Sequence, residues 1–304
     1  MVKTMKVSAK KSGGIDEGFG SRLFDICNVL LMLLLMFATF YPLYYVLVVS
    51  LSDGHSVMRG DVAFWPKGFT LSTYQLIFDD VSIWRSYANT ILYTVVGTTI
   101  NVVCTAMCAY PLSKKSFYGR GFFTLMIVIT MFFSGGLIPS YLLVQKLHML
   151  NTMWALVIPG AISVWNMVIM RTFFQSIPNE LYESAEMDGS NELISFLRIT
   201  LPLSKPILAT MALFYAVGHW NSFFSAMIYL DEKDKFPLQI ILRNMVVMGE
   251  MSNQTQELGG IYASVTATNI KYAVIVIAVL PIVMVYPFIQ KYFVKGMMIG
   301  SLKG

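Results

Sequence analysis

The chain carries little charge for its length. Asp, Glu, Lys and Arg make up only 13% of its 304 residues, whereas hydrophobic residues make up 56%. An average soluble domain has about one quarter charged residues, so this composition excludes an ordinary soluble fold. The chain is therefore interpreted as a membrane protein.

The motifs of common enzymes are missing as well. The sequence has no G-x-x-x-x-G-K-[ST] phosphate loop, which excludes ATP binding by that motif. It also lacks an H-E-x-x-H zinc motif and a G-x-S-x-G nucleophile elbow. We therefore expect a chain that is not an enzyme, with no catalytic residue and no cofactor of its own.

Cysteine is scarce and badly placed for disulfides. The three cysteines, Cys27, Cys104 and Cys108, all fall in apolar stretches expected to be helical, and their number is odd. Cys104 and Cys108 share a helix face, which suits a metal, but no His or carboxylate stands near them. We interpret them as small packing residues and predict no metal site.

Long apolar runs are what the sequence has in abundance. A bilayer core about 30 Å thick needs about 20 apolar residues per helix. Six runs are long enough, and they predict an all-α membrane protein with six transmembrane helices. They cover residues 24–50, 87–112, 122–144, 153–174, 206–230 and 270–294. Residues 1–22 are predicted to be a cytoplasmic tail, and residues 23–304 a single transmembrane domain.

Basic residues predict the orientation. Lys and Arg gather in the N-terminal tail, in the short loop 113–121 and at the C-terminal end from residue 291. Because basic residues favour the cytoplasmic side, both termini and the loop 178–204 are expected inside. The net charge of +5 then reflects membrane topology, so no nucleic-acid partner is predicted.

The loop 178–204 has helix signals of its own. Asn179 is expected to cap a short helix, Gly189 to adopt the left-handed conformation that ends it, and Ser190 to cap a second helix that Pro202 stops. Five acids occur in this loop before the next base, which suits a basic groove on a partner. The alternative is a solvated amphipathic surface helix.

One pattern in this loop favours the docking interpretation. Its residues follow the order E-x-A-x-x-x-G, nine residues, then I-x-L-P. This pattern resembles the inner-membrane permeases of binding-protein-dependent ABC importers, most closely the maltose and oligosaccharide type. Two further segments resemble the same family: HWNSFFSAMIYL at 219–230 and YPFIQKYFVKGMMIGSLKG at 286–304. Ser184 departs from the alanine common in that family, but its hydroxyl is small.

The resemblance implies a type I importer fold and a division of labour. The loop would insert into a cleft of a cytoplasmic ATPase dimer that binds ATP and Mg²⁺. The other partners would be a second, non-identical permease, an extracytoplasmic sugar-binding protein and the lipid of the bacterial cytoplasmic membrane. The coupling residues implied in this way are Glu183, Ser184, Ala185, Asp188, Gly189, Ile199, Leu201 and Pro202.

The C-terminal GMMIGSLKG would, by the same resemblance, reach toward the ATPase dimer. The alternative for this segment is a simple basic flank of the last helix.

Polar residues inside membrane helices are candidates for the translocation path. Placing a polar side chain in the bilayer costs free energy, so such residues often have a function. Aromatic rings cover the C–H faces of sugars, and amides or imidazole bind their hydroxyls. The alternative is that Trp220 and Asn221 only lock their helix against its neighbours, since membrane helices use polar side chains for interhelical hydrogen bonds. The candidates are Asn166, Tyr215, His219, Trp220 and Asn221.

A competing function is an autonomous secondary transporter or channel. Such proteins usually show inverted repeats, or intramembrane carboxylates that couple ions. Neither feature is visible in this sequence, where the acids lie near helix ends or in loops. The predicted function is therefore the permease subunit of an ATP-driven sugar importer.

Overall fold

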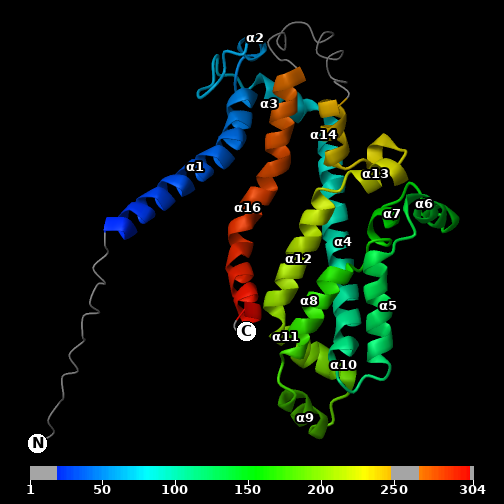
Figure 1. The fold of residues 1–304 in the computed structure, drawn as a ribbon. Coiled ribbons are helices and arrows are strands. Elements are labelled where there is room, and N and C mark those ends of the chain that lie inside the picture. Colours follow the sequence, from blue (N-terminus) through cyan, green and yellow to red (C-terminus); the bar gives the residue numbers. More distant parts are fainter. Residues whose placement is uncertain (1–18, 248–266, 302–304) are drawn as a thin grey trace, which may run out of the picture.

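The computed structural model describes residues 19–247 and 267–301, and in these ranges every regular element is helical. Among the described residues, three helices are long and apolar enough to cross a membrane: α1 (Phe19–Ser50), α4 (Val81–Ser113) and α16 (Ala267–Ser301) (Figure 1). The number of possible spans rises to five if each of two bent helix pairs counts as one span. The all-α membrane fold is confirmed, whereas the count of six spans and the orientation stay predictions.

Helix α1 leans away from the other helices (Figure 1). It begins at Phe19, so residues 19–22 of the predicted tail are helical, and residues 1–18 lie outside the described part. Its apolar side chains are exposed along most of the helix, and Pro42 does not interrupt it. Exposed apolar side chains of this kind suit lipid or another membrane helix.

The run 122–144 was predicted as one helix, and this prediction is wrong. It forms α5 (Arg120–Phe132) and α6 (Leu137–Lys146), which meet at an angle of 113°. The chain turns through Gly136, whose φ of +84° is a conformation that glycine adopts without strain. Apolar composition alone did not reveal this turn.

The run 153–174 is also broken. It forms α7 (Trp154–Val157) and α8 (Val164–Gln175), separated by a segment that contains Pro159 and Gly160. Proline has no backbone N–H to continue the helical hydrogen bonds, and glycine weakens a helix further. The prediction of one continuous span is therefore wrong here too.

The run 206–230 becomes α12 (Lys205–Trp220) and α13 (Phe224–Tyr229). Before α12 lie α10 (Glu192–Ser195), the π-helix η1 (Phe196–Thr200) and α11 (Leu201–Leu203), and the chain bends by 80° between α11 and α12.

The prediction that Pro202 stops the second helix of the loop is wrong. Pro202 stands at the start of α11, where a proline is tolerated because the first N–H groups of a helix need no intrahelical partner. The break comes two residues later, at Ser204.

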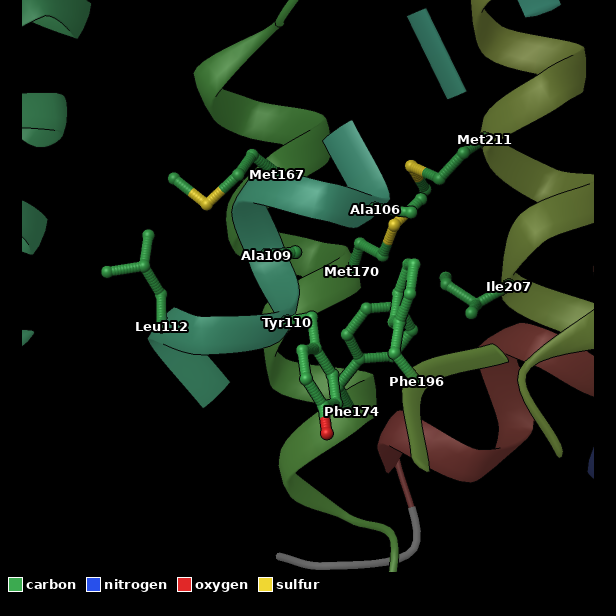
Figure 2. Packing of buried hydrophobic residues seen from close by; sticks show 10 residues of the cluster. All are labelled: Ala106, Ala109, Tyr110, Leu112, Met167, Met170, Phe174, Phe196, Ile207 and Met211. Atoms are coloured by element: carbon green, nitrogen blue, oxygen red, sulfur yellow. The ribbon is translucent and has the colours of Figure 1, made fainter. Parts of the chain in front are cut away.

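Helices α4, α8 and α12 pack side by side and enclose the main buried core (Figure 2). The core lies toward the ends of these helices that adjoin α10 and η1. Its buried members are Ala106, Ala109, Tyr110, Leu112, Met167, Met170, Phe174, Phe196, Ile207 and Met211. Because Phe196 belongs to η1, the segment that leads out of the loop is part of this core.

The opposite end of the molecule carries α2 (Gly54–Met58), α3 (Ser72–Asp79), the 3-10 helix η2 (Lys233–Lys235) and α14 (Leu238–Val247) (Figure 1). Asn151, with φ of +58°, organises the connections there. Its Nδ2 donates to Glu232 Oε1 at 2.5 Å, and its carbonyl accepts from Lys235 Nζ at 2.9 Å. These contacts tie the segment after α13 to the segment after α6.

A buried asparagine joins α16 to the end of α1. The Nδ2 of Asn269 donates to the carbonyl oxygens of Val49 and Ser52, at 3.1 and 2.8 Å, and the residue is fully buried. Because Ser52 lies just past the end of α1, Asn269 supplies donors that the terminating helix lacks.

We predict that Asn269→Leu lowers the unfolding free energy of the detergent-solubilised chain by about 1–2 kcal/mol, because two buried carbonyls lose a donor. A thermal unfolding curve measures the loss as a lower Tm. The neighbouring exposed Thr268 offers the matched control, Thr268→Val, which is expected to leave the Tm unchanged. An unaltered Tm in Asn269→Leu would contradict the assigned role.

Candidate coupling loop and translocation helices

The loop 178–204 projects at one end of the molecule as helix α9 (Glu180–Met187) (Figure 1). Glu180 and Glu183 occupy its first turn, where the helix dipole favours negative charge. Asn179 was expected to cap this helix with its side chain, and that expectation is wrong. Asn179 has helical angles, φ −66° and ψ −28°, and makes no side-chain cap, because the chain already turns at Pro178.

A glycine turn closes α9 as predicted. Gly189 has φ of +83°, its N–H donates to Glu186 O at 3.0 Å, and the N–H of Ser190 donates to Ala185 O at 2.9 Å. This pair of bonds defines a Schellman motif, which requires a left-handed residue at the glycine position. Apart from its two chain neighbours, no described residue has an atom within 4 Å of the place where a Cβ on Gly189 would stand, so the backbone conformation alone requires the glycine.

The cap of the second helix was placed one residue too early. Asn191, not Ser190, caps α10, with its Oδ1 accepting from the N–H of Ile194 at 2.9 Å. Ser190 is used instead to close the preceding turn through its backbone. Two successive polar residues allowed either assignment, and the turn geometry decided it.

The implied coupling residues fall into two groups. Those of α9 and its turn are largely exposed, whereas those of η1 and α11 lead back toward the core. The first group is Glu183, Ser184, Ala185, Asp188 and Gly189, and the second is Ile199, Leu201 and Pro202. Among the described residues no salt bridge involves Glu183, so its carboxylate is open to a partner.

The loop is tied to the end of α4 by contacts that the sequence did not predict. Tyr110 Oη donates to Glu192 Oε2 at 2.5 Å, and Lys114 Nζ lies 2.9 Å from the centroid of the Tyr182 ring. A cavity of about 860 Å³, lined mainly by apolar side chains, lies beside these contacts. Spacing offered one weak signal, because Tyr110 and Lys114 stand one helical turn apart where α4 ends.

The five translocation candidates do not form one cluster. Tyr215 and Trp220 are buried and bonded to other helices: Tyr215 Oη pairs with Thr105 Oγ1 at 2.7 Å, and Trp220 Nε1 donates to Ala278 O at 3.1 Å. Asn221 is exposed just past the end of α12, and its Nδ2 donates to Val217 O of the same helix. Asn166 is buried on α8.

His219 faces α4. Its Nε2 is buried without a hydrogen-bond partner in the part of the chain that the structure describes, and an added Cβ on Gly97 would approach it to 2.5 Å. Trp220 hydrogen-bonds α12 to α16, as the alternative interpretation holds for this residue, whereas Asn221 bonds its own helix. Tyr215 also joins α12 to α4. A sugar contact stays a prediction, and Asn221 is the candidate most open to it.

A polar stripe on α4 was missed by the sequence interpretation. Asn101 Nδ2 donates to Gly160 O at 3.1 Å, and three further polar atoms on this stripe, Thr94 Oγ1, Thr98 Oγ1 and Asn101 Oδ1, are buried without a partner among the described residues. The residues recur every three or four positions on one helix face, a period that the sequence does display. Their periodicity is the sequence signal that could have identified this face as buried.

The predicted contact of the C-terminal segment 296–304 with an ATPase dimer falls outside the described side chains. Helix α16 continues to Ser301, and residues 302–304 are not described. That contact stays a prediction.

Residues 101–299 match the family model described as binding-protein-dependent transport system inner membrane component. The chain belongs to this family. The matched region includes the coupling loop, the core formed with α4 and α8, and the helices α12 and α16. The resemblance inferred from the loop motif is therefore confirmed.

Two similar proteins come from Bacillus subtilis, and one of them is named as a permease. The permease is 44% identical to protein LplC of Bacillus subtilis over 93% of its own length and 96% of the relative's. It is 40% identical to the polygalacturonan/rhamnogalacturonan transport system permease protein YtcP of the same species, over 93% and 99% of the two chains.

A solved structure agrees with the fold. A chain of a bacterial ABC transporter involved in the import of the acidic polysaccharide alginate matches with a TM-score of 0.85 and 34% identity, over 91% of this permease and 98% of that chain. The type of fold expected from the sequence, an ABC importer permease, is thereby confirmed.

We predict that Gly189→Val destabilises the turn after α9, because a left-handed β-branched residue costs at least about 1–2 kcal/mol. Hydrogen exchange should become faster at the amides of Gly189 and Ser190. Gly189→Asn is the control, since asparagine tolerates this conformation, and its exchange should stay near that of the native chain. Equal protection in both variants would contradict the Schellman assignment.

Proposed function

We propose that this permease forms one half of the translocation pathway of an ATP-driven oligosaccharide importer in the bacterial cytoplasmic membrane. The observation that carries the proposal is the coupling loop: an exposed acidic helix, closed by Gly189 and anchored to the core helices. An autonomous transporter does not require a docking surface for an ATPase. An importer driven by a separate ATPase requires one, because conformational changes of the ATPase must reach the membrane helices.

The energy source is a partner subunit. The chain lacks a phosphate loop, so ATP and Mg²⁺ belong on a cytoplasmic ATPase dimer. Glu183, exposed in the first turn of α9, supplies negative charge for a basic residue of the ATPase cleft. A second, non-identical permease completes the pathway, which agrees with the apolar surface that α1 leaves exposed.

An oligosaccharide is the substrate class we propose. Two observations support it: the relative YtcP is named for polygalacturonan and rhamnogalacturonan transport, and the similar solved structure is that of a transporter involved in the import of alginate. A sugar-binding protein would deliver the substrate to the outer end of the molecule. Asn151, Glu232 and Lys235 brace that end, and the contacts of Glu232 with Lys235 and Asn151 hold the pKa of this carboxyl below its usual range.

Alternating access follows from the packing. Closure of the ATPase dimer on ATP displaces α9, and the loop carries α4, α8 and α12 with it because these elements share one core. The pathway then opens outward to receive sugar from the binding protein. Hydrolysis releases the loop and returns the pathway to the inward state.

We predict that a tagged permease, gently solubilised from its native cell, co-purifies with a phosphate-loop ATPase and a second permease, as mass spectrometry can identify. Glu183→Lys should lose the ATPase but retain the second permease, because only the charge of the docking surface is reversed. Asp25→Lys on α1 makes the same charge change away from the loop and should retain both. Recovery of the native chain alone would favour an autonomous transporter.

Two neighbouring residues separate a sugar contact from a packing contact. Asn221→Ala should weaken the stimulation of ATPase by the sugar-loaded binding protein without lowering the Tm, because its amide bonds only its own helix. Trp220→Phe should lower the Tm, since it removes the bond to α16, and leave the stimulation nearly unchanged. An unaltered sugar response in Asn221→Ala would remove this residue from the pathway.

A further inference from the structure

Lys114 links the end of α4 to the coupling helix. It directly follows the last residue of α4, and its Nζ lies 2.9 Å from the centroid of the Tyr182 ring and 5.1 Å from that of Tyr110. An ammonium group over a ring face is attracted by the negative π-surface. Because Tyr182 belongs to α9, one side chain joins two elements that are distant in sequence.

A second link runs in parallel. Tyr110 Oη donates to Glu192 Oε2 of α10 at 2.5 Å, and the Tyr110 ring packs against the ring of Phe196 in η1, tilted by 49° with centroids 4.9 Å apart. A hydrogen bond to a carboxylate is stronger than one between neutral groups. The end of α4 therefore holds both helices of the loop, α9 through Lys114 and α10 through Tyr110.

Tyr182 is fixed from its other side as well. Its Oη pairs with Thr200 Oγ1 at 3.0 Å, and Thr200 is fully buried in η1. The Tyr182 ring thus has a cation on its face and a hydrogen bond at its edge. It cannot shift without disturbing both the end of α4 and the segment that enters α12.

Packing and polar contacts together hold the loop on this side. The Tyr110 ring packs against Phe196 in the main core, and a cavity of about 860 Å³ is lined by Tyr110, Lys114 and Glu192 among others. The polar contacts of Lys114 and Tyr110 lie beside this cavity, where the apolar packing between α4 and α10 is incomplete.

The environment of Lys114 differs from that of a surface lysine. Burial lowers the pKa of its ammonium group, and the charges of Glu192 and Glu186 oppose that shift and favour the charged form. Lys115, the next residue, is exposed. The two lysines carry the same charge in the same loop, yet only Lys114 is enclosed by the coupling elements.

We propose that Lys114 is a positioning residue through which displacement of α9 is transmitted to α4. The inference rests on the proposed function, in which an ATPase moves the loop. When α9 moves, the ammonium–ring contact draws the end of α4 along. Helix α4 then carries its neighbours α8 and α12, since the three pack along their lengths.

The test uses the complete complex purified from its native cell and reconstituted in lipid nanodiscs. The three natural cysteines are removed, and cysteines that carry spin labels are introduced at Ser82 of α4 and Met36 of α1. The distance between the two labels is measured with and without Mg-ATP and vanadate, which trap the complex. With Lys114 in place, we expect trapping to produce a second label-to-label distance. In Lys114→Met the population of that distance should fall roughly fivefold or more, while ATPase co-purification is unchanged.

Two matched variants complete the design. Lys114→Arg keeps the cation over the ring and should restore the second distance, which is the shift measured here. Lys115→Met removes the same charge from the exposed neighbour and should behave as the native chain.

The proposal is overturned if Lys114→Met shows the same shift as the native chain, or if Lys115→Met loses the shift equally. It is also overturned if Lys114→Met fails to assemble, because Lys114 would then be needed for folding. Absence of the shift in an active native complex would also overturn it. Absence of any ATPase in the native preparation would instead reject the proposed function.

Discussion

Backbone groups at a helix break inside a membrane have no water to bond, and the protein must satisfy them itself. The segment between α7 and α8 meets this constraint through two side chains. Asn101 Nδ2 donates to the carbonyl of Gly160, and the N–H of Ser163 donates to Tyr215 Oη at 3.0 Å. Because Asn101 lies on α4 and Tyr215 on α12, satisfying this break also joins the three central helices.

One of these three helices, α4, connects the two ends of the molecule. At one end their core includes Phe196, so the coupling loop continues into the core. At the other end Asn89 and Tyr93 of α4 donate to carbonyls of the segment 234–236. Helix α4 thus contacts both the face expected to meet a sugar-binding protein and the loop expected to meet an ATPase. This arrangement suits the transmission of a conformational change between the two surfaces.

The coupling loop illustrates what local sequence signals can predict. The acidic first turn of α9 and the left-handed Gly189 follow from short-range rules and were predicted. The caps at Asn179 and Ser190 and the stop at Pro202 were wrong, because neighbouring residues offered equivalent local solutions. Hydrogen bonding over five or six residues, in the Schellman turn and in η1, selected among them.

The membrane class and the family could be read from the sequence alone, since apolar length and the E-x-A-x-x-x-G pattern of the loop 178–204 are properties of consecutive residues. Where the apolar runs break and which polar residues pair depends on three-dimensional packing. Breaks at Gly136 and Pro159 depend on whether neighbouring helices satisfy the freed backbone groups. The contacts of Lys114 with Tyr182, and of Tyr215 with Thr105, join segments far apart in the chain, and no local pattern encodes them.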